Sequence, residues 1–221
     1  RTLGKRPARL YDRGSSFLDR DAGCRVASMD ALSDVLRTMR MRGGVFLHGE
    51  FHDPWCLSVK IGASDCAPYL SDTAHIIPYH FVLDGEMAVL TTDGHELRLG
   101  QGDSVLFPRN DPHLLGSDLT RPPVPGDAVV QPPSDGGLAR IVLGGNGAAT
   151  CIVCGFLGAD EVRGNPVVAT LPPVLRLDRR DVGAADWVRS TFAFAAREIA
   201  AGRLGSETVM AKLSELLFVE A

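Results

Sequence analysis

The sequence predicts a mainly β domain, a small barrel or sandwich, with one helix before it and two helices after it. From Val45 to about Gly155, short β-like runs alternate with tight-turn sequences such as Asp84-Gly85 and Asp93-Gly94. Many short strands at close spacing are typical of barrels and sandwiches. On either side of this stretch the apolar residues recur at the 3.6-residue spacing of a helix. The predicted order is therefore helix, strands, two helices.

The N-terminal 28 residues differ from the rest of the chain. Residues 1–28 carry seven Lys or Arg residues against three Asp, and their apolar residues show no period. We interpret them as a disordered arm or a translated leader ahead of Met29, with a functional basic arm as the alternative. From Met29 to Met41 the pattern predicts a helix that Asp30 can cap and that Gly43-Gly44 ends.

The central stretch divides into seven predicted strands. They are Val45 to Leu47, Leu57 to Ile61, His80 to Leu83, Met87 to Thr91, Glu96 to Leu99, Ser104 to Phe107 and Ala149 to Val153. A segment rich in Pro, Gly and Asp runs from Gly116 to Gly147. A loop of this length inside a compact domain is often a lid or binding loop, and a disordered excursion is the alternative.

Two helices are predicted after Leu171-Pro172-Pro173. The first covers 184–201, with an apolar stripe of Val188, Phe192, Ala195 and Ile199. The second begins after the N-cap residue Ser206, and its apolar stripe includes Val209, Leu213 and Leu217. Because Ala221 ends the sequence with this helix still running, we expect the chain to be cut within an element. We therefore divide it into the arm 1–28, a β domain over 29–175 and a helical segment over 176–221.

Composition limits the classes of protein to which this chain can belong. The formal net charge is -4 and the pI is about 5.9, whereas a free-standing nucleic-acid binder is usually basic. No run of 18 apolar residues occurs, so no membrane span is expected. The basic start is not followed by the apolar region of a secretory signal. These observations predict a cytoplasmic protein.

Five cysteines, at irregular spacing, are expected to be reduced thiols. Cys151 and Cys154 form a C-x-x-C pair in a β-rich run. Residues three apart on a strand point to opposite faces, so the two sulfurs would diverge. We predict structural cysteines and no chelated ion.

The most specific stretch runs from His80 to His113. It contains Val82-Leu83-Asp84-Gly85, Gly102-Asp103 and Pro108 through His113. The glycine-aspartate pairs supply residues that tolerate positive φ at tight corners. This arrangement resembles the core of the cupin family, which implies a jelly-roll β-barrel.

The resemblance also bears on whether the domain binds a metal ion. Cupin enzymes hold a divalent ion with two His and one Glu from the first motif and one His from the second. Here Pro78 stands at the Glu position, and only His113 matches a ligand position. One ligand is too few for a stable site, so no catalytic metal and no cofactor are expected. Strand alternation from Pro78 turns His80 toward the barrel interior.

Further landmarks resemble the sensor domain of AraC-type transcription regulators. They are Met29 through Leu36, Met41 through Phe46, Pro54-Trp55, Gly144 through Thr150, Cys154-Gly155 and Asn165 through Pro173. The resemblance covers about 29–221. It implies a domain that binds a small-molecule effector and pairs with a second copy. In that family a double helix-turn-helix domain after the two helices reads DNA, and this sequence does not contain it.

Three residues are the ligand-binding candidates: Trp55, His80 and His113. For each, a purely structural place in the core is the alternative. Val209, Leu213 and Leu217 are the candidate seam of a homodimer, and the alternative is that this helix packs wholly on its own barrel. Two other functions stay open at this point: a metal-dependent cupin enzyme, such as a dioxygenase or isomerase, and a purely dimerising module.

Overall fold

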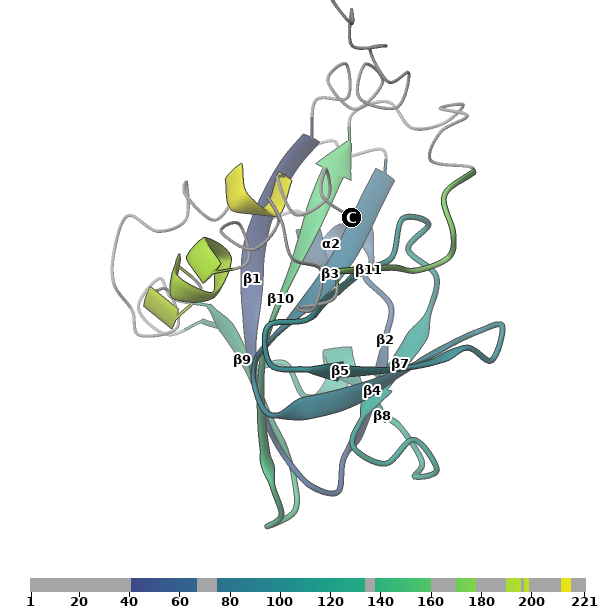
Figure 1. Cartoon of the computed structure of the whole chain (residues 1–221), viewed down its shortest axis with the longest axis vertical. Coiled ribbons are helices and arrows are strands. Elements are labelled where there is room, and N and C mark those ends of the chain that lie inside the picture. The colour runs from purple at the N-terminus through teal and green to yellow at the C-terminus, as the bar shows by residue number, and fades with distance from the viewer. Residues whose placement is uncertain are drawn as a thin grey trace, which may run out of the picture. The chain divides into compact units, whose positions relative to one another are not determined.

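A computed structural model describes residues 41–66, 75–133, 138–159, 170–177, 190–195, 197–198 and 212–215. These residues all belong to one compact unit, 31–221. Figure 1 shows two β-sheets facing each other, with the helical segments beside one of them. Within the described ranges, no helix is both long enough and apolar enough to cross a membrane. The predicted mainly β architecture is confirmed.

The larger sheet has six strands in the order β11-β6-β3-β10-β1-β9. They are β1 (Met41–His52), β3 (His75–Asp84), β6 (Ser104–Leu106), β9 (Ala139–Gly144), β10 (Ala149–Ala159) and β11 (Leu175–Leu177). The long strand β10 lies antiparallel to both β1 and β3. Strand β9 runs parallel to β1 at the sheet edge. Strand β1 thus lies between β9 and β10, which follow it much later in the chain.

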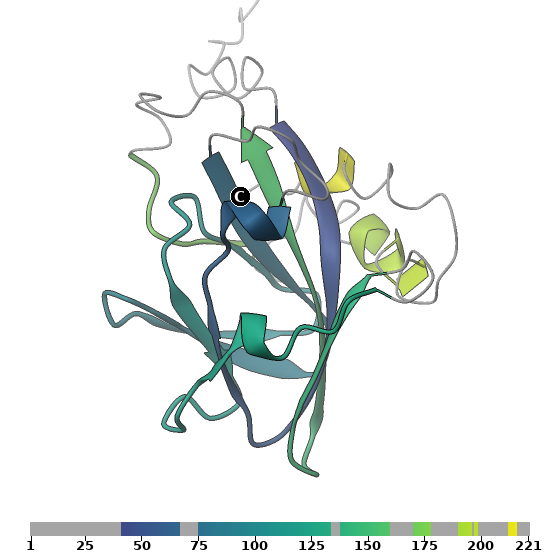
Figure 2. The ribbon, with the colours of Figure 1, turned by 180° about the vertical axis from the view of Figure 1, so that it is seen from behind.

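The smaller sheet has five strands in the order β5-β4-β7-β2-β8. They are β2 (Cys56–Val59), β4 (Glu86–Thr91), β5 (Glu96–Gly100), β7 (His113–Gly116) and β8 (Val124–Pro125). Two short helices, α2 (Ala63–Cys66) and the 3-10 turn η1 (Gly126–Ala128), lie in the connections, and Figure 2 shows them from behind.

Alternation along the strands creates two apolar clusters. The inner cluster fills the space between the sheets and includes Phe51, Val82, Leu115 and Ile152. The outer cluster lies on the other face of the larger sheet. It joins Tyr79, Phe81 and Val153 to Phe192, Ala195 and Leu213 of the helical segments. The described part of the first C-terminal helix therefore packs on the barrel through Phe192 and Ala195, two residues of its predicted stripe.

The predicted corner glycines have the expected backbone. Gly85 has φ of 79° and Gly102 has φ of 86°, both in the left-handed region that favours glycine. A Cβ on Gly85 would also overlap the Ala149 carbonyl oxygen. Both turns accordingly favour glycine. At Gly85 the backbone conformation and the lack of space for a side chain both require it.

Some predicted boundaries were wrong. Gly43 and Gly44, expected to end a helix, lie inside β1, which already begins at Met41. They continue the ladder because they pair with Leu157 and Phe156 of β10. Strand β9 forms within the predicted loop 116–147, and β11 crosses the predicted boundary between 175 and 176. The predicted arm 1–28 and the helix residues 29–40 lie outside the described residues.

Candidate ligand-binding cavity

A cavity of about 950 Å³ lies between the two sheets. Its walls come from both sheets and are largely apolar. The apolar wall residues include Phe46, Leu47, Phe51, Leu57, Val59, Leu90, Leu115, Ile141 and Ile152. Ligand pockets in proteins have volumes of about 300–1,000 Å³ and mainly hydrophobic walls. The cavity is therefore at the large end of the range for small-molecule sites.

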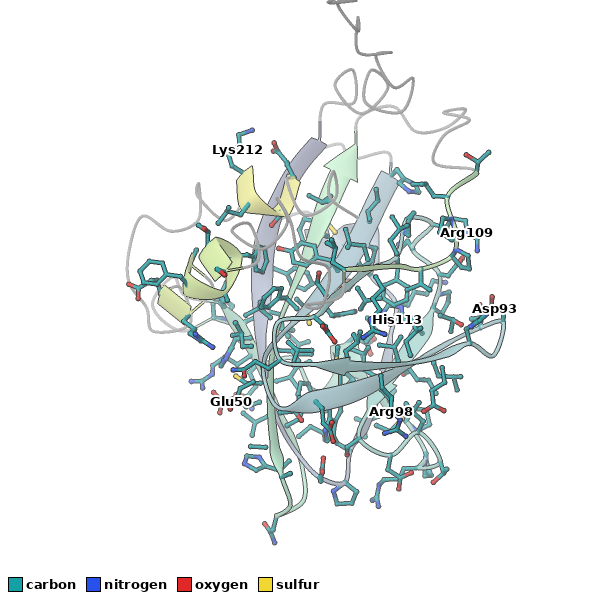
Figure 3. All side chains as sticks on the ribbon, viewed as in Figure 1. Glu50, Asp93, Arg98, Arg109, His113 and Lys212 are labelled. Atoms are coloured by element: carbon teal, nitrogen blue, oxygen red, sulfur yellow. The ribbon has the colours of Figure 1, made fainter. Side chains whose placement is uncertain are left out.

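Two histidines form the main buried polar feature of this wall. His80 comes from β3 of the larger sheet and His113 from β7 of the smaller one, and they are 1% and 3% exposed. Their Nε2 atoms lie 2.8 Å apart. The His113 ring stacks on Phe107, with ring centroids 3.6 Å apart. Figure 3 shows the His113 side chain inside the body of the domain.

The partners of the two rings determine where their protons are. The Asp111 carbonyl can only accept, so Nδ1–H of His113 donates to it across 2.9 Å. A neutral His113 ring then has a bare Nε2, which accepts from Nε2–H of His80. Nδ1 of His80 is left as an acceptor, 2.9 Å from Sγ of Cys154. The thiol of Cys154 therefore donates to His80, and the hydrogen bonds all point the same way, from Cys154 to Asp111.

Burial keeps Cys154, His80 and His113, the side chains of this hydrogen-bonded series, uncharged at neutral pH. Desolvation lowers the pKa of His113 to about 4, against a smaller raising effect of the hydrogen bond to Asp111. Desolvation, and then the neighbouring His113, hold the pKa of His80 well below its ordinary value. Burial raises the pKa of the Cys154 thiol. The interior is a neutral, hydrogen-bonding environment.

The charged groups of the cavity lie at its edge. They are Lys60, Asp65 and Asp127, all of which are exposed. The Pro-rich segment predicted as a lid contributes Pro125, Gly126, Asp127, Val130, Pro132 and Pro133 to the lining. The segment thus borders the cavity along part of its length, while 134–137 lie outside the described residues.

Trp55, the third residue expected to bind ligand, does not line the cavity. It is 1% exposed and stacks on Phe51, with ring centroids 4.0 Å apart. Phe51 lines the cavity and separates the indole from it. The reason is local: after β1 the chain turns, and Trp55 immediately precedes β2, with its backbone N–H donating to Oγ of Ser117. Any effect of Trp55 on a ligand would pass through Phe51.

Leu213, one of the expected dimer residues, is part of the outer apolar cluster. It is 4% exposed and packs within its own chain, so its position favours the alternative in which this helix covers its own barrel. The neighbouring Ser214 hydroxyl lies 2.7 Å from the Tyr79 hydroxyl. Val209 and Leu217 lie outside the described residues.

The residues present do not suit the metal that cupin enzymes hold. The two Nε2 atoms are hydrogen-bonded to each other, and two histidines are fewer ligands than the three or four of a stable metal site. Cys154 lies on the opposite side of the His80 ring and could not join them at one centre. His75, at the start of β3, contacts the Pro108 carbonyl instead. Among the described residues, no set of three His, Cys, Asp or Glu side chains could hold a metal.

The two cysteines of the C-x-x-C pair point to opposite faces of the larger sheet, as predicted. Cys154 belongs to the inner cluster and Cys151 packs against the outer one. On that outer face Sγ of Cys151 lies 3.0 Å from Nε2 of His48.

Sequence reasoning assigned Cys154 only a structural role and missed its place beside His80. Strand alternation could have indicated it, because Cys154 shares a face with Ile152, two residues earlier. Its pairing with His80 across 74 positions could not be read from the sequence.

The profile of the cupin family matches residues 30–221. Among curated proteins the chain has no match.

Three solved structures are similar at low identity. YhaK from Escherichia coli aligns with a TM-score of 0.32 and 10% identity, over 59% of this chain and 40% of YhaK. ToxT from Vibrio cholerae O395 aligns with a TM-score of 0.36 and 6% identity, over 81% of this chain and 53% of ToxT. Wild-type ToxT of Vibrio cholerae strain SCE256 with bound unsaturated fatty acid aligns with a TM-score of 0.29 and 9% identity, over 75% of this chain and 56% of that ToxT chain. The chain thus spans about half the length of these ToxT structures.

Proposed function

We propose that this chain, which belongs to the cupin family by its match over residues 30–221, is the effector-sensing domain of an AraC-type transcription regulator. The match confirms the family predicted from the motif between His80 and His113, and this cupin type is found in AraC-type regulators. The observation that supports sensing most directly is the cavity of about 950 Å³ between the sheets.

The lining indicates the kind of effector. Burying a charged group without a partner costs several kcal/mol, and the charged side chains of this cavity are confined to its exposed edge. Apolar surface, by contrast, gains about 25 cal/mol per Å² when it leaves water. The proposed effector is therefore a mostly apolar small molecule that fills the space between the sheets.

A thermal-shift screen of apolar metabolites tests this proposal. A ligand at 100 times its Kd adds about 2.7 kcal/mol to the free energy of unfolding, which is a clear rise in Tm. Val59→Trp fills the cavity, because Val59 lines it. Val142→Trp is the matched control, because Val142 is 52% exposed and is not in the lining. A shift present in the wild type and Val142→Trp and absent in Val59→Trp supports the proposal; shifts that survive in Val59→Trp contradict it.

The regulator's other properties are part of the same proposal. The chain would act in the cytoplasm, would pair with a second copy without using Leu213, which is buried in its own chain, and would leave DNA reading to a helix-turn-helix domain. Its net charge of -4 favours the last point. We expect no specific gel retardation of DNA by this chain at physiological salt, and specific retardation would refute that assignment.

The rival function is a metal-dependent cupin enzyme. The ligand count argues against it, because within the described ranges no three His, Cys, Asp or Glu side chains come together to hold an ion. Elemental analysis of protein purified without a His-tag decides between the two. Iron, manganese or zinc near one per chain, lost in His113→Ala, would make the enzyme the better assignment.

A further inference from the structure

The two facing nitrogens of the cavity wall are chemically different. Nε2 of His80 carries a proton and donates, whereas Nε2 of His113 is bare and accepts. The remaining ring nitrogens are committed to the Cys154 thiol and the Asp111 carbonyl. A ligand that contacts this pair therefore meets one donor and one acceptor, side by side.

A ligand's polar end can enter only by opening the contact between the rings. Two consecutive hydrogen bonds span about 5 Å, so the two Nε2 atoms would have to move apart from their present 2.8 Å. Both nitrogens are buried, and a buried donor or acceptor left without a partner is costly. A group that replaces the lost contact must then accept from His80 and donate to His113.

A hydroxyl does both with one oxygen. An ether or ketone satisfies His80 but leaves Nε2 of His113 bare. A carboxylate can only accept, so it would need a second proton on His113, and both charges would then have to be buried among apolar walls. Lys60, a cation of the lining, is exposed at the cavity edge.

We propose that His80 and His113 select an uncharged ligand whose polar end is a hydroxyl, as in an apolar alcohol or phenol. This inference rests on the proposed function, because it concerns the same cavity. The apolar walls contact the body of the ligand, and the histidine pair hydrogen-bonds to its hydroxyl group.

The test separates the two proposals. Nile red, a neutral apolar dye, first reports occupancy of the cavity in the full chain by its fluorescence. Saturable binding to the wild type that is lost in Val59→Trp supports the proposed function. No saturable binding by the dye or by any probe below, in a protein that melts cooperatively, contradicts the proposed function and this inference together.

Three matched probes then compete for the cavity at pH 7.5: 2-naphthol, 2-methoxynaphthalene and 2-naphthoate. The same comparison is made with 1-decanol, methyl nonyl ether and decanoate, so that the shape of the body does not decide the result. In at least one series we expect the hydroxyl compound to bind roughly 10-fold to 100-fold more tightly than its ether and its carboxylate. Equal binding of the three heads, or tightest binding of a carboxylate, would overturn the inference and leave the proposed function standing.

Two variants link the preference to the histidine pair. His113→Phe keeps a flat ring against Phe107 and removes the acceptor. In this variant the advantage of the hydroxyl over the ether should fall to within about 3-fold. His95→Phe, at an exposed histidine outside the lining, should keep the wild-type ratio. A ratio unchanged in His113→Phe, with Nile red still bound, would also overturn the inference.

Discussion

Nε2 of His80 donates to Nε2 of His113 across 2.8 Å, and this hydrogen bond joins the two sheets of the barrel through the wall of the cavity. Both rings are neutral and almost fully buried. The bond gives the apolar interior one directional polar feature.

Acid should destabilise the protein through this pair. In the unfolded chain a histidine takes up a proton near pH 6.5, whereas burial lowers the pKa of folded His113 to about 4. Between these values the unfolded state holds more protons, so the free energy of unfolding falls as pH falls from 6.5 to 4. The contribution of His113 lost over that interval is roughly 3 kcal/mol, and His80 acts with the same sign.

Urea unfolding at several pH values checks this, with His113→Phe as the comparison. The carboxylates titrate in both proteins, so the difference between the two pH profiles isolates the histidine. We expect a shallower acid loss in the variant. Parallel profiles would show that His113 is not buried as a neutral ring.

Tyr79→Phe should loosen the docking of the helical segment 212–215. The Tyr79 hydroxyl donates to the Gly44 carbonyl across 3.1 Å and accepts from Ser214 across 2.7 Å. Removing it should cost about 1–3 kcal/mol and speed hydrogen exchange in that segment. Thr120→Val removes an exposed hydroxyl bonded to Asp118 and should cost less than about 0.5 kcal/mol. Unchanged exchange over 212–215 in Tyr79→Phe would contradict the contact.

Gly155→Ala should destabilise the fold through overlap rather than strain. A Cβ at Gly155 would overlap the Tyr79 ring and hydroxyl and the Gly44 carbonyl, while one at Gly44 would meet nothing within 4 Å. We expect a loss of about 1–3 kcal/mol for Gly155→Ala. Gly44→Ala, on the neighbouring strand, is the matched control and should stay close to the wild type in thermal unfolding. Equal Tm values for the two variants would refute the close contact between Gly155 and the Tyr79 side chain.

Leu213→Ala distinguishes a core leucine from a dimer contact. Because Leu213 is 4% exposed within its own chain, truncation should lower the free energy of unfolding by about 2–5 kcal/mol. Val142→Ala, at a half-exposed position, should cost little. Sedimentation velocity should give the same oligomeric state for all three proteins. A folded monomer of near wild-type stability, formed from a dimeric wild type, would instead place Leu213 in the interface.

Much of the barrel could be predicted from the sequence because strand alternation and turn chemistry are local. The corner residues Gly85 and Gly102 were recognisable because positive φ has few tolerant residue types. The inward direction of His80 followed from a period of two along β3. Boundaries failed where glycines were ambiguous: Gly43-Gly44 suits the end of a helix as well as a strand, and only pairing with β10 decides it.

By itself, then, the sequence determined the fold class, the corners of the barrel and the inward face of His80. Only the tertiary structure decided that His80 meets both His113 and Cys154, that Phe51 separates Trp55 from the cavity, and that Leu213 packs on its own barrel. The physical reason is the range of the interactions. Alternation and turn propensity act over a few residues, whereas these contacts depend on how two sheets close on each other and on the register between strands far apart in the chain.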